Sequence, residues 1–226
     1  MSMANLGEAF TYVFSDREWP AKFIFGVLFL VLSIFLVGVP FVAGYFIEII
    51  RRVALDERPY LPEWSSLGHL FSRGLTYIAV VLVYALPVLV LGCCVAAVGA
   101  LAEAGRTDGN LAAGVVSTVL SCLALPLGLV YNAILPIVTI QYATTGSFGA
   151  AFKFNEMWEL VKANLGNYIV VALVAWAVSN LIAPLGLVLC GVGILATGFY
   201  ALTVIAYLYG LFYRAAGRPP AAAVLV

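Results

Sequence analysis

The acid that lies deepest in an apolar segment is Glu48, and Arg51 and Arg52 follow it at i+3 and i+4. A charge inside a membrane is costly, so an acid in such a segment is a functional candidate. On a helix, the same spacing also forms an intrahelical ion pair, and arginine side chains are long enough to reach the interface. We expect the structural ion pair and keep Glu48 and Arg52 as candidate site residues.

Three amide side chains are the other polar candidates inside apolar segments. Asn132 and Gln141 share a segment with Pro126 and Pro136, and Asn180 lies near the last expected turn. Amides beside a proline break either line a conduit or an ion site, or bond to neighbouring helices and to freed carbonyls. The second arrangement is the more common one.

The remaining reactive residue types form no catalytic or metal-binding pattern. His69 is the only histidine, and it has no Ser, Cys or acid at a spacing that would make it a general base. The cysteines lie in apolar runs without a CxxC pair or a nearby histidine, as buried structural cysteines do. We therefore expect no enzymatic activity, no metal and no cofactor. The four cysteines are Cys93, Cys94, Cys122 and Cys190.

The composition places these residues in a membrane. Apolar types make up 64% of the 226 residues, charged types make up 10%, and the mean hydropathy is +1.09. Soluble domains contain about 25% charged residues, so this chain cannot cover a soluble globule with charge. Eleven Lys and Arg balance eleven Asp and Glu, which leaves no net charge to attract nucleic acid. The sequence predicts an all-α integral membrane protein with several spans.

The apolar segments are long enough for five or six membrane segments, because a helix needs about 20 residues to cross the hydrocarbon. The last segment holds two spans, with a turn expected at Ala183–Gly186. The first segment is either one tilted span kinked at Pro40 or a hairpin that turns at Gly38–Pro40. The segments are 23–50, 75–102, 111–143 and 168–213.

The basic residues favour the hairpin. If all three apolar units are hairpins, every Lys and Arg except Arg106 falls on one side of the membrane. The positive-inside rule assigns that side to the cytoplasm, together with both termini. We expect six membrane segments in the cytoplasmic membrane, with a first hairpin that is either fully spanning or re-entrant.

A repeated hexapeptide supports three units. NLGEAF at 5–10, SLGHLF at 66–71 and SFGAAF at 147–152 each precede an apolar unit and begin an amphipathic stretch. Each unit would contain an interfacial helix followed by a helical hairpin. The interfacial helices would form either a collar around the bundle, which we favour, or a membrane-surface docking platform. The expected repeats are 5–60, 61–144 and 145–214, followed by a short tail at 215–226, and the candidate interface anchors are Trp19, Trp64 and Trp158.

Several of these residues resemble a known family. The pattern includes Gly44-Tyr45, Arg51-Arg52, Leu61-Pro62-Glu63-Trp64, Leu70-Phe71 and Gly74, and it continues with Phe152-Lys153-Phe154, Trp158, Ala163-Asn164 and Tyr168. The chain is similar over roughly 5–214 to the prokaryotic membrane family known as domain of unknown function 4013. The LPEW segment is the most specific part. The resemblance implies a multi-span prokaryotic membrane protein and no particular activity.

Two functions remain open at this point. The first is a non-enzymatic accessory or assembly subunit, or a homo-oligomeric scaffold, whose partners are the lipid bilayer, other membrane subunits or further copies of the chain. The alternative is a small transporter or channel for a weakly charged or amphipathic solute or lipid. A water-filled cavity shared by Glu48, Asn132, Gln141 and Asn180 would favour transport, whereas separate pairing in a dry bundle would favour the scaffold.

Overall fold

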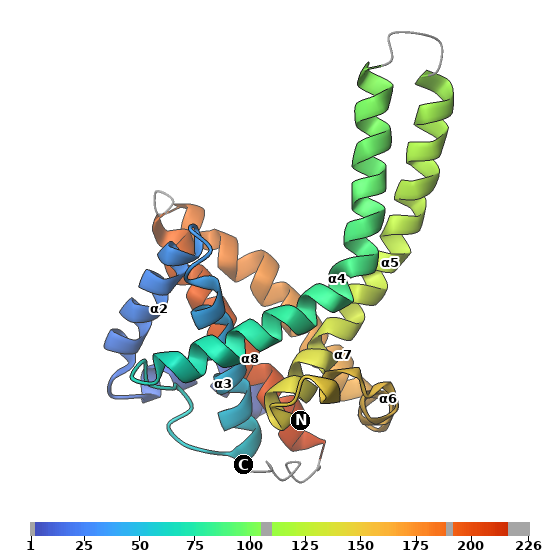
Figure 1. The fold of residues 1–226 in the computed structure, drawn as a ribbon. Coiled ribbons are helices and arrows are strands. Elements are labelled where there is room, and N and C mark those ends of the chain that lie inside the picture. The colour runs from blue at the N-terminus through green and yellow to red at the C-terminus, as the bar shows by residue number, and fades with distance from the viewer. Residues whose placement is uncertain (1–2, 105–109, 189–191, 217–226) are drawn as a thin grey trace. The chain divides into compact units, whose positions relative to one another are not determined.

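The computed structural model describes residues 3–104, 110–188 and 192–216, and these residues form helices without a strand. Four stretches are long and apolar enough to cross a membrane: Leu67–Ala100, Gly114–Thr145, Leu165–Leu187 and Gly193–Ala215. The helices, drawn in Figure 1, are α1 (Met3–Thr11), α2 (Trp19–Ser33), α3 (Val39–Leu55), α4 (Leu67–Ala104), α5 (Asn110–Thr145), α6 (Phe154–Ala163), α7 (Leu165–Ala177) and α8 (Val192–Ala215), with shorter 3-10 or π turns η1 (Tyr12–Ser15), η2 (Gly149–Phe152), η3 (Val178–Ile182) and η4 (Ala183–Val188).

The chain divides into two compact units. The first, which we call the bundle, comprises Met1–Ile78 and Pro136–Val226. The second comprises Ala79–Leu135, and we call it the α4–α5 hairpin. Both α4 and α5 contribute residues to each unit.

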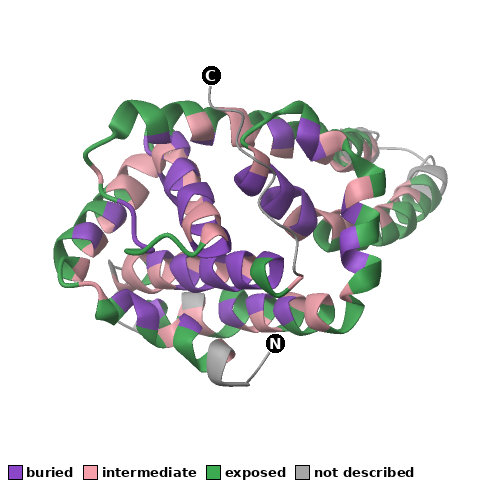
Figure 2. Ribbon diagram, turned by 90° about the horizontal axis from the view of Figure 1, so that it is seen from below, coloured by how far each residue is buried: buried purple, intermediate pink, exposed green. Residues whose placement is uncertain are grey.

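The core of the bundle lies between α3 and α8. Tyr45, Ile49 and Ile50 of α3 and Phe212 of α8 are fully buried, and the buried residues lie on helix sides that face one another (Figure 2). Gly210 permits this close approach, because a Cβ there would lie 2.8 Å from the carbonyl oxygen of Ile50.

The first apolar segment forms two helices. Helix α2 ends at Ser33, Leu36 adopts a left-handed conformation with φ 64°, and α3 begins at Val39. The rings of Phe29 and Phe41 stack at 4.9 Å across the two helices. The backbone of this segment therefore forms a helical hairpin, as one of the two interpretations of the sequence expected. Helix α2 is about 22 Å long, which is shorter than the ~30 Å hydrocarbon layer.

Helices α3 and α4 cross at glycines. A Cβ on Gly44 would lie 1.9 Å from the carbonyl oxygen of Leu70, and a Cβ on Gly74 would lie 1.7 Å from that of Pro40. Only glycine lets the two backbones approach this closely. Both glycines were part of the family resemblance, and the crossing gives the physical reason for them.

The interfacial helices are not alike in the three expected units. Helix α6 is a separate amphipathic helix, and α1 with η1 precedes α2. The second expected interfacial helix is instead the first part of α4, which runs without a break from Leu67 to Ala104. The expected turn at Ala183–Gly186 lies inside η4, and the chain between η4 and α8 falls outside the described residues. The threefold repeat and the number of membrane crossings stay predictions.

The α4–α5 hairpin consists of two helical segments side by side (Figure 1). Its less exposed positions recur every three or four residues on each helix, so each helix packs through one narrow stripe. The opposite faces carry exposed large apolar side chains, among them Leu86, Leu89, Leu123 and Leu129. The stripe is formed by Val81, Tyr84, Val88, Leu91, Val95 and Val98 on α4 and by Ser117, Leu120, Ala124, Leu127 and Tyr131 on α5.

Candidate functional site

The charged site of the bundle is centred on Glu48, which is 5% exposed. Its carboxylate accepts hydrogen bonds from Arg51 at 2.9 Å and Arg52 at 3.2 Å, in the same helix. Arg73 of α4 donates a third at 2.6 Å. The sequence spacing predicted the two intrahelical partners. Arg73 was missed, because it lies 25 positions further on and only the crossing of α3 and α4 brings it close.

The arginines of this cluster also contact other elements. Arg51 forms an ion pair with Glu57 at 2.8 Å, and Arg52 donates to the carbonyl oxygen of Pro59 at 3.0 Å. The Tyr142 hydroxyl donates to the backbone carbonyl of Arg73 at 3.0 Å. The cluster therefore ties α3, the loop after it, α4 and α5 together. Each of the three guanidinium groups has at least one protein partner, which is the arrangement of a structural node.

A second node surrounds Trp64. Its indole stacks on Tyr45 at 4.3 Å with an interplanar angle of 6°, and on Phe29 at 4.7 Å with an angle of 14°. The indole N–H donates to the carbonyl oxygen of Lys22 at 2.9 Å. Both ring faces are thus covered by protein, and the expected anchoring of Trp64 at the headgroups stays a prediction. The LPEW segment is a strap that packs back on α2 and α3.

Lys22 of α2 binds the strap at its first residue, Leu61. Its ammonium is paired with Asp16 at 2.7 Å, and both side chains are at most 10% exposed. It also donates to the carbonyl oxygen of Leu61 at 3.2 Å. A buried ammonium needs such partners, so Lys22 is a structural cation that closes the strap onto α2.

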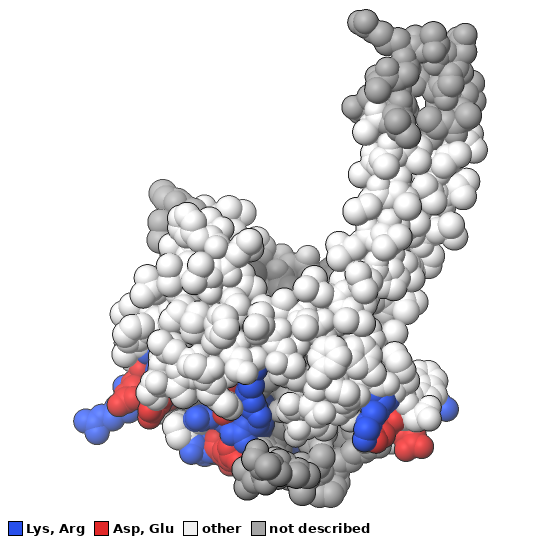
Figure 3. Space-filling view, viewed as in Figure 1, with Lys and Arg blue, Asp and Glu red and all other residues white. Residues whose placement is uncertain are grey.

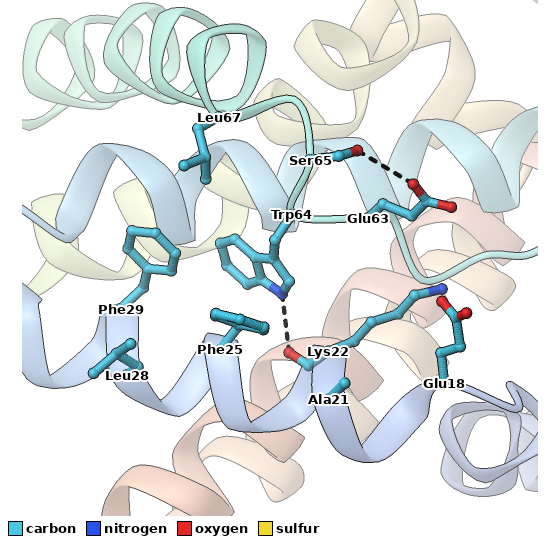
Figure 4. A pocket seen from close by; sticks show the side chains of 10 residues that line it. All are labelled: Glu18, Ala21, Lys22, Phe25, Leu28, Phe29, Glu63, Trp64, Ser65 and Leu67. Atoms are coloured by element: carbon cyan, nitrogen blue, oxygen red, sulfur yellow. Dashed lines mark hydrogen bonds between the residues drawn. The ribbon is translucent and has the colours of Figure 1, made fainter.

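A pocket of about 450 Å³ opens between α2 and the strap (Figure 4). Glu18, Lys22, Glu63 and Ser65 contribute its polar groups, and aromatic and aliphatic side chains line the remainder. Pockets that bind small molecules have this volume and this mixture of a mainly apolar lining with a few polar groups. The lining residues are Glu18, Ala21, Lys22, Phe25, Leu28, Phe29, Glu63, Trp64, Ser65 and Leu67.

A second pocket of about 500 Å³ lies among α2, α3, α4, η3 and α8. It contains no charged residue, and its hydroxyl groups are those of Ser33, Tyr77 and Ser179. The Ser33 hydroxyl donates to the carbonyl oxygen of Phe29 at 2.8 Å, and that of Tyr77 lies 2.9 Å from the Thr139 hydroxyl. Neither Glu48 nor any of the three amide candidates lines it.

The three amide candidates have separate local partners. Asn132 donates to the carbonyl oxygen of Gly128 and Asn180 to that of Trp176, each at 2.8 Å within its own helical stretch. Both of these side chains are exposed. Gln141 is 4% exposed and donates to Glu156 at 3.1 Å. The described residues therefore hold each polar candidate in its own hydrogen-bonding environment.

The other two candidate interface anchors are Trp19 and Trp158. Trp19 packs edge-on against Phe14 at 5.1 Å. Trp158 on α6 is 59% exposed, and the Lys162 ammonium lies 5.0 Å from the centre of its ring. An exposed tryptophan beside a lysine is the combination found at headgroup depth, so these positions are compatible with the anchoring that the sequence predicts.

An exposed polar link joins the end of α8 to the end of α3. Arg214 donates to Asp56 at 2.7 Å, and the Tyr60 hydroxyl donates to the same carboxylate. The Tyr60 hydrogen bond and the positive charge of Arg214 hold the pKa of Asp56 below its usual range. Sequence reasoning could not find this link, since its members are up to 158 positions apart.

No group of three or more His, Cys, Asp or Glu side chains in the described ranges is arranged to hold a metal ion. Cys93, Cys94 and Cys122 are free thiols on the exposed surface of the α4–α5 hairpin. The expected lack of enzymatic activity and of a cofactor stays a prediction.

Comparison with known proteins agrees with the resemblance seen in the sequence. Neither a curated protein nor a solved structure matches the chain. A family described as "Protein of unknown function (DUF4013)" matches residues 27–192, which include α3, the strap and the α4–α5 hairpin. This is well over half of the chain, and it contains both glycines of the α3–α4 crossing and all of the Glu48 cluster. The chain belongs to the DUF4013 family.

Proposed function

We propose that this protein is a non-enzymatic integral membrane subunit that works through helix contacts with other membrane proteins or with further copies of itself. The observation that carries the proposal is Asn132, an exposed amide among the large apolar side chains on the surface of the α4–α5 hairpin. Lipid covers apolar side chains at no cost, but it offers an amide no hydrogen-bond partner. A neighbouring helix offers the amide such a partner.

The depth of Asn132 strengthens this argument. Thirteen residues separate it from Thr145, where α5 ends, which corresponds to about 20 Å along the helix. With Thr145 at the edge of the hydrocarbon, as this proposal has it, the amide would lie well inside a layer of ~30 Å. Its N–H already reaches Gly128, and the amide still has a second hydrogen and a carbonyl oxygen to offer a partner.

The topology that accompanies this proposal has six membrane segments, namely α2, α3, α4, α5, α7 and α8. Charged side chains of the bundle gather at one end (Figure 3). We assign that end, with both termini, to the cytoplasm of a prokaryotic cell by the positive-inside rule.

The transporter is the weaker candidate. A pathway for a polar solute needs its polar groups along one cavity. The separate partners of Glu48, Asn132, Gln141 and Asn180 favour the subunit or scaffold instead.

Native mass spectrometry of the full chain, extracted gently from its own membrane, tests the proposal. We expect a stoichiometric foreign subunit or a homo-oligomer. Asn132→Leu should weaken that association about threefold to thirtyfold, because an interhelical hydrogen bond in a membrane contributes about 0.6–2 kcal/mol.

The matched control is Thr118→Val in the same hairpin, which removes an exposed hydroxyl whose single hydrogen is already donated to the carbonyl oxygen of Gly114. It should leave the association unchanged. A bare monomer for the unmodified chain would overturn the proposal, and equal weakening by both variants would remove Asn132 as its basis.

A further inference from the structure

Helices α4 and α5 lie side by side in the hairpin (Figure 1), and α5 carries a second stripe beside the one that packs on α4. Five of its six members directly follow a residue of the packing stripe, so the second stripe lies about 100° further round the helix. Its spacing alternates between four and three residues, as in the heptads of a coiled coil. We call it the outer stripe, and it consists of Gly114, Thr118, Ser121, Leu125, Gly128 and Asn132.

The packing of the described residues gives the glycines of the outer stripe no role. Every member of the stripe is exposed except Gly128, which is half-buried. A Cβ on Gly114 or on Gly128 would meet nothing within 4 Å, although glycine in a helix costs about 1 kcal/mol relative to alanine. A helix that approaches closely from outside the chain would explain both residues, as the α3–α4 crossing explains Gly44 and Gly74.

The small residues of the outer stripe follow a strict period. Gly114, Ser121 and Gly128 recur every seven residues, and the other three members recur with the same period between them. Small side chains in such a series let two membrane helices approach closely. In a parallel pair of helices, the small residues would occupy the d positions of the heptad and the other three the a positions. A period of seven also predicts a left-handed crossing.

The remaining exposed side of α5 has a different composition. It carries Val116, Val119, Leu123 and Val130, whose exposed fractions lie between 46% and 56%. Lipid tails cover large aliphatic side chains of this kind, whereas small and hydrogen-bonding side chains are enriched where membrane helices meet. The composition of α5 therefore distinguishes a lipid-facing side from the outer stripe.

A second copy of the chain supplies a surface that matches the outer stripe. Copies in one membrane share an orientation, so two α5 helices that meet about a twofold axis run parallel, and each position meets its own counterpart. An amide is both a donor and an acceptor, so Asn132 can bond with Asn132 of the partner subunit. A single asparagine at an a position also fixes the register of a helix pair. The Thr118 hydroxyl donates to the carbonyl oxygen of Gly114 at 2.8 Å, so Thr118 contributes its shape.

We propose that this chain forms a parallel homodimer in which the outer stripes of two α5 helices pack against each other. The two Asn132 amides hydrogen-bond across the twofold axis, Ser121 and Gly128 permit the close approach, and Leu125 packs between them. The inference rests on the proposed function and names its partner, a second copy of the chain.

Cysteine cross-linking of the full chain in its own membrane tests the contact. The four native cysteines are replaced by alanine, and single cysteines are introduced one at a time along 118–125. Under a mild oxidant we expect a covalent dimer from Ser121→Cys and from Leu125→Cys. Val119→Cys and Leu123→Cys should give about tenfold less, because a disulfide forms only where the two Cα atoms lie within about 7 Å.

A wedge in the outer stripe tests the same contact without a cross-link. Ser121→Leu adds bulk at the closest approach and should lower the dimer fraction in native mass spectra at least about fivefold. The matched control is Cys122→Leu at the next position, which is exposed but about 100° away from the outer stripe. It should leave the dimer fraction unchanged. The cross-link at Leu125→Cys does not depend on the folding of either leucine variant.

Three results would overturn this inference: no covalent dimer, equal cross-linking all round α5, or the strongest cross-linking at Val119 and Leu123. A foreign subunit in the native mass spectra without a homodimer would also overturn it, and the proposed function would stand. A bare monomer would overturn both, so the two failures are distinguishable.

Discussion

The bundle and the α4–α5 hairpin are built from similarly apolar helices, but they use polar side chains in opposite ways. In the bundle, Glu48 binds three guanidinium groups and Lys22 is paired with Asp16, so charges join helices to each other. In the hairpin, the Asn132 side chain is exposed and donates a hydrogen bond to the carbonyl oxygen of Gly128 in its own helix. Contacts within one chain thus fix the charged groups of the bundle, whereas the amide of the hairpin lies on a surface that lipid or another protein must cover.

Glycines test this difference most strongly. Gly74→Ala places a Cβ 1.7 Å from the carbonyl oxygen of Pro40, and the obstacle is backbone rather than a flexible side chain. We expect a loss of at least about 3 kcal/mol of stability, or failure to assemble. The measurement is the unfolding free energy in a detergent titration followed by circular dichroism.

The matched control lies in the same helix but in the hairpin. A Cβ on Gly92 would meet nothing within 4 Å, so Gly92→Ala should be neutral or slightly stabilising, as alanine is the better helix former. If the two variants were equally stable, the close crossing of α3 and α4 would be wrong.

The Glu48 cluster comes next in expected size. Glu48→Gln leaves three guanidinium groups, each 23–26% exposed, around a neutral amide. Removing one member of a largely buried ion cluster costs about 3 kcal/mol, and partial solvation of the arginines should reduce this to about 2 kcal/mol. The readout is again the unfolding free energy.

Glu57→Gln is the control for that variant, since it removes a carboxylate that is 49% exposed and contacts Arg51 alone among the ion pairs. Its effect should stay below about 1 kcal/mol. A similar loss in both variants would mean that the cluster is a surface feature and not a node.

Trp64 and Trp158 compare the inside of the bundle with its surface. Trp64→Phe removes the hydrogen bond to Lys22 and part of the stack between Tyr45 and Phe29. We expect a loss of about 1–2 kcal/mol and a marked change in tryptophan fluorescence. Trp158→Phe, at a position 59% exposed, should change stability by less than about 0.5 kcal/mol. The opposite order would place the structural role at α6.

Local patterns in the sequence predicted much of this arrangement. The i+3 and i+4 spacing identified two of the three partners of Glu48, and the lengths of the apolar segments located the long helices. The Gly38–Pro40 signal marked the reversal between α2 and α3. These features depend on neighbours within a few residues, which is the range in which sequence patterns are informative.

The features that were missed depend on long-range packing. Arg73 reaches Glu48 only because Gly44 and Gly74 let two helices touch. Trp64 is of the residue type that anchors helices at the membrane interface, but its ring stacks on Tyr45 and Phe29. The pocket beside it requires α2 and the strap to be placed against each other, and no local pattern specifies that.

Acid should remove the exposed polar link at Asp56 with a small effect on stability. The Tyr60 hydroxyl and Arg214 hold the pKa of Asp56 below its usual range, so the folded state keeps this carboxylate ionised at a lower pH than the unfolded chain does. The stabilisation is therefore fully present above the unfolded pKa of about 3.9 and is lost as the pH falls through the lower folded value.

Melting temperatures of the unmodified chain and of Asp56→Asn, measured in detergent from neutral pH down to strong acid, should show this dependence. We expect a small, constant difference in melting temperature between the two proteins at neutral pH, which disappears only below about pH 4. It should correspond to less than about 1 kcal/mol because the pair is exposed to solvent. Salt should shrink the gap, since it screens exposed ion pairs. A gap that persists in acid would mean that Asp56 acts through its shape at the end of α3 and not through its charge.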